Sequence, residues 1–438
     1  MHSSQLRLHA IGLAIASAWL GLVANARADE LGDLKTQVDD LQRKIAELEK
    51  RPASAATRDA NASGAVLAGA TKGSFRLPDS DTSITLGGYV KLDAIYSDKS
   101  AGVNSTADQQ YEAGSVPAGP NAGANERNQI KLHARQSRLF FKTDTPTPVG
   151  GLGTFLEFDL FGTSGNESVS NSHGLRVRHA YGTLGNFLAG QTWTTFSDPS
   201  AYPETLDFGG PAGQIFVRQA QVRWTQPFAG GQWAVALENP ESVVALPDGT
   251  SFRADDDRFP DIAANLQWPT AFGKYSLAGL IRQVRVDSAS APASQTEKWG
   301  YGIGVNGVIP FGSLDDARFS LYQGNALGRY TVGFFSDGIL DTEGQVSLPS
   351  QWVAAASYRH YWSATVRSTL ALSALHANNG AGTAGGVNKE AQSAHLNVIW
   401  SPVKQANLGL EYLLARRETT DGSSGRLNRV QASAQYFF

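Results

Sequence analysis

The sequence predicts an all-β transmembrane barrel of sixteen antiparallel, up-and-down strands, preceded by a short N-terminal coiled-coil helix in the periplasm. Three observations lead to this fold class: an export signal, sixteen segments in which apolar and polar residues alternate, and a C-terminal strand that ends on an aromatic residue. In a membrane barrel, alternate side chains meet lipid and the interior, so the apolar character is spread along each strand.

Residues 1–28 are predicted to be a signal peptide. Arg7 makes the start basic, residues 11–23 are apolar, and residues 26–28 read Ala-Arg-Ala, a pattern typical of a cleavage site. The sequence after this segment contains no apolar stretch of the about 20 residues that a spanning helix needs. Removal of the segment changes the formal net charge from −3 to 35 − 40 = −5, which gives no indication of a nucleic-acid partner. The absence of cysteine excludes disulfides and thiol chemistry.

Residues 29–51 carry an apolar seam with alternating spacings of three and four, which is typical of a parallel coiled coil. The seam residues are Leu31, Leu34, Val38, Leu41, Ile45 and Leu48. A lone amphipathic helix on a surface is the alternative. Because fewer than three heptads are too short to be stable alone, this helix predicts a homo-oligomer whose order the seam leaves open. Pro52 ends the helix, and residues 52–81, rich in Ala, Ser, Gly and Thr, are expected to form a flexible linker.

The barrel itself is expected over 82–438. Its strands are predicted near 84–96, 129–143, 151–162, 174–184, 187–194, 215–227, 231–239, 260–268, 274–287, 297–310, 316–324, 349–360, 364–376, 392–400, 406–418 and 426–438. Long connections are predicted at 98–128, 163–173, 195–214, 240–259, 288–296, 325–348, 377–391 and 419–425, and they alternate with short ones. Outer-membrane barrels have this rhythm, with long loops outside and short turns in the periplasm. An exported β-sandwich or propeller is the alternative, but it gives no reason for the rhythm.

The last strand is expected to close the barrel by pairing with the first. Residues Val430, Ala432, Ala434, Tyr436 and Phe438 share one face, and polar residues occupy the other. A membrane barrel places such terminal aromatics, here Tyr436 and Phe438, in the aromatic girdle at the bilayer interface.

Strand alternation directs two sets of charged side chains into the predicted pore. The basic set is Lys91, Arg138, Lys142, Arg176, Arg178, Arg223, Arg282, Arg359, Arg367 and Arg429. The acidic set is Asp93, Glu157, Asp159, Glu238 and Glu411. Rings of Arg or Lys favour anions, and Arg binds carboxylates through two parallel hydrogen bonds. The alternative is that many of these arginines only brace the wall against nearby acids.

Residues 197–213, after the fifth strand, are predicted to form the constriction of the pore. Asp198, Glu204 and Asp207 are expected to face the basic wall across the pore and to produce a transverse field. The Gly-Gly-Pro turn at 209–211 fits a loop that folds inward, and an ordinary extracellular loop is the alternative.

Six short stretches carry a resemblance to a known family. They are Ser-Arg-Leu-Phe-Phe-Lys at 137–142, Phe-Leu-Glu-Phe-Asp at 155–159, Leu-Ala-Gly-Gln-Thr-Trp at 188–193, Pro-Glu-Thr-Leu-Asp-Phe-Gly-Gly-Pro at 203–211, Ala-Leu-Glu-Asn-Pro-Glu at 236–241 and Gly-Asn-Ala-Leu-Gly-Arg-Tyr at 324–330. In this order they resemble the DcaP-like family of trimeric outer-membrane porins, named for dicarboxylic-acid uptake. The resemblance implies a sixteen-stranded homotrimer surrounded by outer-membrane lipid and lipopolysaccharide. It also implies passive uptake of small organic anions such as dicarboxylates, without a cofactor.

Other function classes remain as alternatives. A sugar-selective porin predicts an aromatic track through the lumen, for which Tyr89, Phe155 and Trp193 are the candidates. A structural or adhesive barrel is a second alternative, and an outer-membrane enzyme is a third. No nucleophile-elbow or zinc-protease pattern appears in the sequence, so we expect neither catalysis nor a metal. The acidic run around Asp256 is expected to be a solvated loop rather than a Ca²⁺ site.

Overall fold

The structure is a computed structural model, and it describes Arg43 and residues 66–99, 108–119, 128–163, 168–287, 296–331 and 335–438. The predicted signal peptide (1–28) lies outside these residues, and so does the predicted coiled-coil helix (29–51) apart from Arg43, which is helical and exposed. Among the described residues there is no helix that is both long and apolar enough to cross a membrane.

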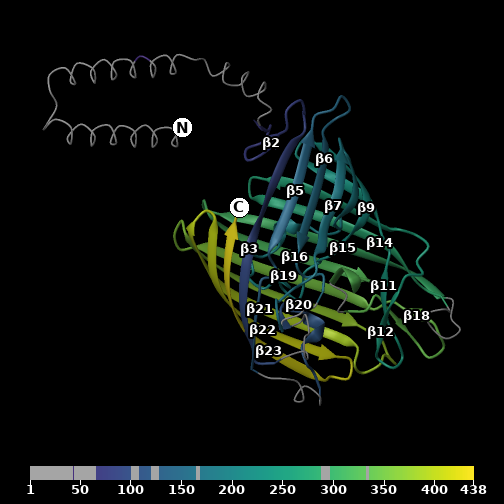
Figure 1. Cartoon of the computed structure of the whole chain (residues 1–438). Coiled ribbons are helices and arrows are strands. Elements are labelled where there is room, and N and C mark those ends of the chain that lie inside the picture. Colours follow the sequence, from purple (N-terminus) through teal and green to yellow (C-terminus); the bar gives the residue numbers. More distant parts are fainter. Residues whose placement is uncertain are drawn as a thin grey trace. The chain divides into compact units, whose positions relative to one another are not determined.

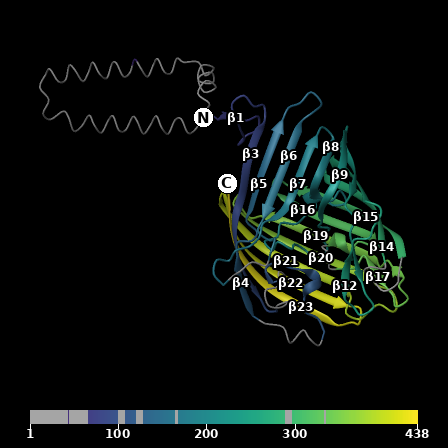
Figure 2. The same cartoon turned by 45° about the vertical axis from the view of Figure 1, so that its right-hand side comes forward.

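Sixteen antiparallel strands form a closed barrel, in which each strand pairs with its neighbour in the sequence and the last pairs with the first (Figure 1, Figure 2). In chain order they are β3 (Ser83–Ser97), β4 (Gln129–His133) together with β5 (Arg138–Thr145), β6 (Leu152–Asp159), β7 (Arg176–Leu184), β8 (Phe187–Trp193), β9 (Arg218–Phe228), β10 (Gly231–Glu238), β13 (Asp261–Thr270), β14 (Gly273–Val286), β15 (Thr296–Phe311), β16 (Asp315–Asn325), β19 (Ser350–Tyr361), β20 (Val366–Asn378), β21 (Asn388–Val403), β22 (Ala406–Thr419) and β23 (Ser424–Phe437). This confirms the predicted fold class of the barrel.

The second predicted strand, 129–143, is interrupted. Both β4 and β5 pair with β3, but residues 134–137 between them make a turn closed by a hydrogen bond from the Ser137 N–H to the Ala134 carbonyl, 3.0 Å. Opposite the gap, the backbone N–H of Lys91 donates to Ser137 Oγ at 3.0 Å instead of to a strand carbonyl. A side chain therefore replaces the ladder bond, which strand alternation alone does not indicate.

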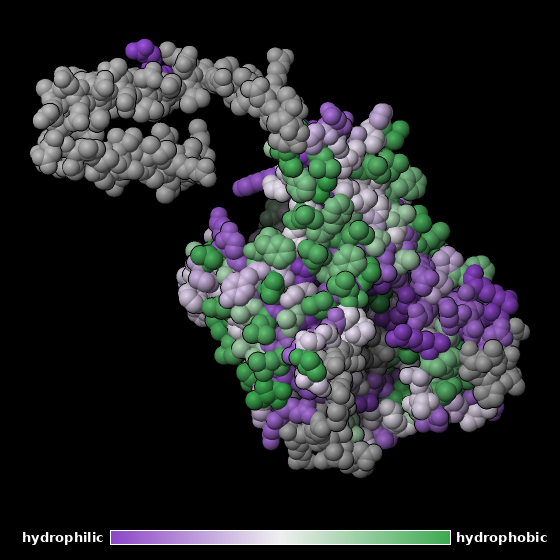
Figure 3. All heavy atoms as spheres, in the orientation of Figure 1, coloured by the Kyte–Doolittle hydropathy of each residue, from purple (hydrophilic) through white to green (hydrophobic). Residues whose placement is uncertain are grey.

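The two faces of the barrel differ as the alternation predicts. On β22, Leu410 and Tyr412 are 51% and 43% exposed on the outside, whereas Glu411 between them is 1% exposed. Apolar side chains gather on the outer face of the barrel in Figure 3. The register is strongly fixed, because a slip of one residue would move the charged set into hydrocarbon at about 2–4 kcal/mol for each Arg or Lys at mid-bilayer.

The C-terminal strand closes the barrel, as predicted. Tyr436 lies opposite Val90, and Phe437 lies opposite Tyr89. The Phe438 N–H donates to the Gly88 carbonyl at 3.2 Å, so the chain stays paired to its last residue. Both Tyr436 and Phe438 are exposed on the outer surface at the end of the barrel where the connections are short turns.

Two predicted connections differ from the structure. Within the predicted linker 52–81, β1 (Leu67–Ala68) and β2 (Phe75–Arg76) pair as a short antiparallel hairpin. The predicted long connection 419–425 is a tight turn, because β22 and β23 continue the ladder to Glu418 and Ser424.

Two of the long loops form a small sheet of their own, which we call the loop sheet. Its strands lie in the order β12 (Ser251–Ala254), β11 (Ser242–Ala245), β17 (Gly338–Leu340) and β18 (Val346–Ser347). Val244, Leu340 and Val346 pack with Val284 and Val286 of β14 in a buried cluster. The loop sheet is therefore held to the barrel by an apolar core.

Candidate pore and its inner loop

The segment between β8 and β9, residues 194–217, lies inside the barrel, and we call it the inner loop. Glu238 on β10 anchors its first residues, because it accepts hydrogen bonds from Thr194 Oγ1 and from the Thr195 N–H, each at 2.6 Å. Phe196 is fully buried against Tyr322 and Tyr330, with ring centroids 5.1 and 5.6 Å apart. The first residues of the inner loop are therefore held against the barrel wall by hydrogen bonds and by the packing of Phe196.

The middle of the inner loop is tied to arginines of the barrel wall. Glu204 accepts from Arg367 Nη2 at 2.6 Å and from Arg367 Nε at 2.9 Å, and its second oxygen is 3.4 Å from Arg359 Nη1. Asp207 is 2.9 Å from Arg429 Nη1. Glu411 on β22 accepts from the Leu206 N–H at 2.7 Å.

These ion pairs set the charge state of the loop carboxyls. Burial alone would raise the pKa of Glu204, but the hydrogen bonds and charge of Arg367, with Arg359, outweigh it and hold the pKa below its usual range. Burial likewise opposes ionisation of Asp207, but the charge of Arg429 and the Tyr111 N–H lower the pKa of that carboxyl overall. Both side chains are therefore anions that hold the loop in place.

The end of the inner loop lies flat against β19 to β21. The Ala212 N–H donates to Ser393 Oγ at 3.1 Å. A Cβ on Gly213 would overlap the backbone carbonyls of Ala354 and Ala374, so only glycine allows this approach. The inner loop thus covers one wall of the barrel, β19 to β23, from the inside.

This geometry corrects the predicted transverse field. Glu204 and Asp207 do not face arginines across the pore, because each directly contacts an arginine of the wall on which the loop lies. Asp198 instead caps the short turn η4 (Pro199–Ala201), accepting from the Ser200 N–H at 3.0 Å. The sequence places these acids on the loop but does not indicate which wall the loop contacts.

The opposite wall, β5 to β9, carries arginines on its inner face. Arg176 and Arg178 reach Asp159 at 2.7 and 3.0 Å, and Arg178 also donates to Glu157 at 2.6 Å. Arg138 is 3.6 Å from Glu157. Three arginines thus share two carboxylates, so this part of the wall keeps positive charge.

Two further arginines of β9 have no carboxylate partner among the described residues. Arg223 donates to Gln221 Oε1 at 2.9 Å and to the Trp193 carbonyl at 2.5 Å. The Arg218 guanidinium stacks on Trp193 at 4.7 Å, and its Nη1 is buried without a hydrogen-bond partner in the described part of the chain. We define the arginine wall as Arg138, Arg176, Arg178, Arg218 and Arg223. With Glu157 and Asp159 as its carboxylates, it has a formal charge of 5 − 2 = +3.

Arg218 was missed from the sequence, because alternation with Val222 assigns it to the outer face. An arginine side chain in hydrocarbon is costly, and this cost is the sequence signal that argues for an inward Arg218.

His179 was missed for another reason. A register shift after Glu157 places Val177 opposite Phe158, so both Arg178 and His179 are buried on the inner side. His179 Nδ1 lies 2.9 Å from Thr192 Oγ1.

Aromatic rings run along the same wall as the arginines. The ring centroid of Phe155 lies 5.7 Å from those of both Tyr181 and His179, and the ring centroid of Trp193 lies 4.7 Å from that of Phe216. Tyr89 lies under the Arg138 guanidinium at 5.2 Å. All three aromatic candidates from the sequence, Tyr89, Phe155 and Trp193, are therefore neighbours of the arginine wall.

Several side chains predicted to line the pore are covered. Fully buried members of the basic and acidic sets, each at most 3% exposed, are Lys91, Arg178, Arg282, Arg429, Asp93, Asp159, Glu238 and Glu411. Arg282 shows the reason, because it is enclosed by Asp261 and by Asp337 of a long loop, at 3.3 and 2.7 Å. Alternation predicts which side of the wall a residue occupies, but loops that fold inward decide whether it meets water.

The remaining predicted basic residues keep partly exposed side chains. Lys142 forms an ion pair with Asp144 at 2.8 Å, close to the end of the barrel that carries the short turns. The side chain of Lys142 is 43% exposed. Arg359 contacts Asp316 on the neighbouring strand β16. Arg318, which the sequence did not single out, joins this group by donating to the Tyr202 carbonyl of the inner loop at 2.7 Å.

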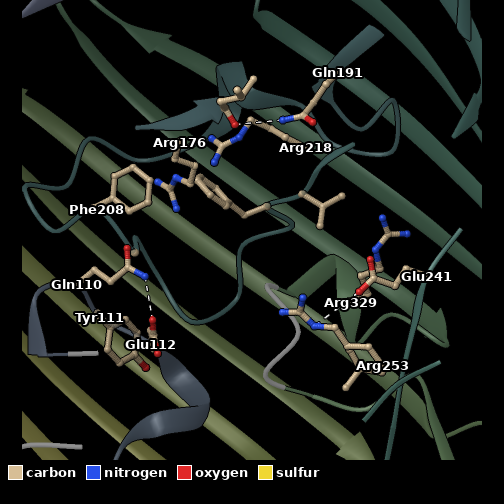
Figure 4. Close-up of a pocket in the computed structure, with 15 residues that line it drawn as sticks. Gln110, Tyr111, Glu112, Arg176, Gln191, Phe208, Arg218, Glu241, Arg253 and Arg329 are labelled. Carbon is tan, nitrogen blue, oxygen red and sulfur yellow. Dashed lines mark hydrogen bonds and ion pairs between the residues drawn. The ribbon is translucent and has the colours of Figure 1, made fainter. Parts of the chain in front are cut away.

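A cavity of about 370 Å³ lies where the inner loop meets the long loops. Figure 4 shows Arg176, Arg218 and Phe208 on one side of it, and Arg253 and Arg329 on another. Glu241 is 3.6 Å from Arg253, and Glu112 is hydrogen-bonded to Gln110. Four arginines from different elements therefore converge on one cavity. The described residues contain no group of three or more His, Asp or Glu side chains that could hold a metal ion.

An apolar outer face, a charged interior and an inner loop in a closed antiparallel barrel define a porin-type outer-membrane channel fold. The chain belongs to the DcaP outer membrane protein family, whose profile matches residues 22–438. No curated protein sequence gives a significant match to this chain.

Solved structures of channels share the fold. The outer membrane channel DcaP of Acinetobacter baumannii is 24% identical, covers 82% of this chain and 97% of its own, and has a TM-score of 0.68. An anion-selective porin from Comamonas acidovorans is 14% identical, with a TM-score of 0.52 and coverage of 82% and 100%. A Salmonella typhi OmpF structure is 9% identical, with a TM-score of 0.52 and coverage of 82% and 98%.

Proposed function

We propose that this protein is an outer-membrane porin for passive diffusion of small hydrophilic solutes, biased to organic anions such as dicarboxylates. The supporting observation is the arginine wall, in which three of the five guanidiniums share two carboxylates and the other two have no carboxylate partner among the described residues. On the opposite wall, Arg359, Arg367 and Arg429 are neutralised by acids. A field that attracts anions therefore comes mainly from one side of the lumen.

In this proposal, cleavage after residue 28 releases a chain with a periplasmic coiled-coil helix (29–51), a linker (52–81) and the barrel (82–438). The long loops face outwards. Strands β5 to β8 have only 7 to 9 residues, whereas a membrane strand needs about 9–11. Contact with other subunits at this low wall would shield it from lipid, which supports a homotrimer with the coiled coil near its axis.

Selectivity in planar bilayers tests the proposal. Purified full-length protein is reconstituted, and the reversal potential is measured in a KCl gradient, with succinate then added as a competing anion. We expect anion preference and a succinate-dependent decrease of chloride current. A preference for cations, or no conductance, would refute the porin proposal in this form.

A sugar-selective porin is the second candidate, because aromatic rings follow the arginine wall from Phe155 to Phe216. Such a channel would be blocked by oligosaccharides that stack on these rings, whereas a dicarboxylate channel would not. An adhesive or structural barrel would pass no solute in a liposome swelling assay. We expect no turnover of esters or peptides by the purified protein.

A further inference from the structure

A groove lies on the outer face of the barrel, over β20 to β23. Its volume is about 510 Å³. Ala374 and Ala394 are among its lining residues, between the larger side chains of Leu372 and Leu414, which are 52% and 45% exposed. Small residues beside large ones leave a depression in an otherwise leucine-rich surface, and its apolar lining suits a hydrocarbon chain.

Two arginines stand at the end of this groove that points to the long loops. Arg416 of β22 and Arg426 of β23 lie directly opposite each other in the ladder. Like charges in this position repel. Arg416 is compensated by Glu418 at 2.7 Å and by Glu390 at 3.9 Å, but Arg426 makes no ion pair or hydrogen bond within the described residues. The site therefore has one uncompensated guanidinium next to a second one.

The height of the wall indicates what covers the groove. Strands β20 to β23 have 13, 16, 14 and 14 residues, more than the about 9–11 that cross a bilayer. This wall can face lipid along its full height, unlike the low wall of β5 to β8. A second copy of the chain would bring apolar strands to the groove, whereas a lipid with an anionic headgroup would also supply the charge that Arg426 lacks among the described residues.

We propose that the groove binds one phosphorylated, acylated glycolipid of the lipid A type, with a phosphate between Arg416 and Arg426 and an acyl chain over Ala374 and Ala394. This site rests on the proposed outer-membrane orientation, in which the long-loop end of β20 to β23 lies at the outer leaflet. Guanidinium groups bind phosphate through charge-assisted, two-point hydrogen bonds. The apolar floor adds the burial of methylene groups.

Native mass spectrometry of the full-length protein in detergent tests the site. The probe is bisphosphorylated hexa-acyl lipid A, compared with the same lipid after removal of its phosphates. We expect discrete binding of the bisphosphorylated form to the wild-type protein, and binding weaker by about tenfold without phosphates, as for the loss of a charged hydrogen bond. Equal binding of the two lipids by the wild-type protein would overturn the proposal, and this arm needs no variant.

Variants locate the lipid. Arg416→Gln with Arg426→Gln should weaken lipid A binding by at least about tenfold, Arg426→Lys should retain most of it, and Arg253→Gln on an outer loop should leave it unchanged. An unchanged affinity of the double variant would refute the site. So would a loss of oligomer without a loss of lipid, which would identify a protein interface. Because the reversal potentials of the Arg416 and Arg426 variants are expected to equal that of the wild type, a failure of the lipid site is distinguishable from a failure of the porin proposal.

Discussion

Glu204 of the inner loop and Arg367 of β20 form a two-point ion pair, with Oε1 to Nη2 at 2.6 Å and Oε2 to Nε at 2.9 Å. They are 163 positions apart in the sequence. This pair, with Asp207 and Arg429, ties the inner loop to β20 and β23, while Phe208 and Phe216 of the same loop stack on arginines of the arginine wall.

Removal of the Glu204 carboxylate should loosen the inner loop. Glu204→Gln leaves Arg367 and Arg359 without this anion, and we expect the docking of residues 203–211 to weaken by about 2 kcal/mol. Hydrogen exchange of that peptide measures the change, with Asp198→Asn as the control, because the Asp198 carboxylate accepts its hydrogen bonds from Ser200 of its own turn. Equal protection in Glu204→Gln and the wild type would contradict the role of the pair.

Acid should have the same effect on the wild-type protein. The pKa values of Glu204 and Asp207 are held below their usual range, so the carboxylates stabilise the docked loop fully above the ordinary values of about 4. That contribution is lost as pH falls through the lowered values. Single-channel current should be quiet at pH 5 and become noisy below about pH 4. Noise that increases as pH rises would reverse the expected sign.

A substitution at Gly213 tests whether the end of the inner loop must lie close against β19 to β21. Gly213→Val places a Cβ against the carbonyls of Ala354 and Ala374, so the end of the loop must move into the lumen and reduce conductance. Gly386→Val is the matched control, because its Cβ meets no atom within 4 Å. Equal conductance of the two variants would show that the contact is not needed.

Asp257 on a long loop predicts a pH dependence of opposite sign. Burial raises the pKa of Asp257 to about 6, although Arg282 and the donors Ser242 and Arg285 favour the anion. The folded loop therefore keeps a proton that the unfolded chain releases, and its stability falls as pH rises from about 4 to 6. Asp257→Asn should remove this dependence and stabilise the loop at pH 7 by on the order of 1–2 kcal/mol. Hydrogen exchange of residues 242–258 at pH 4.5 and 7 measures it, and an unchanged slope in the variant would refute the assignment.

Strand alternation predicted the barrel well, because the cost of charge in lipid fixes every register. Leu410 and Glu411 show this clearly, since their exposures of 51% and 1% follow directly from their positions in the strand. The pairing of charges was beyond the sequence, because Glu204 meets Arg367 only once the loop has folded over β19 to β23. Arg218 and His179 are absent from the predicted pore-lining sets, since a strand start and a register shift leave no periodic trace.

The ion selectivity of the arginine wall tests the central claim most directly. Arg138→Glu with Arg223→Glu changes the formal charge of that wall from +3 to −1, by 5 − 2 = +3 and 3 − 4 = −1. The reversal potential in a KCl gradient should shift from anion-selective in the wild type towards cation-selective in the double variant, whereas Arg426→Gln on the outer face should leave it unchanged. A double variant with the reversal potential of the wild type would show that ions do not pass along the arginine wall.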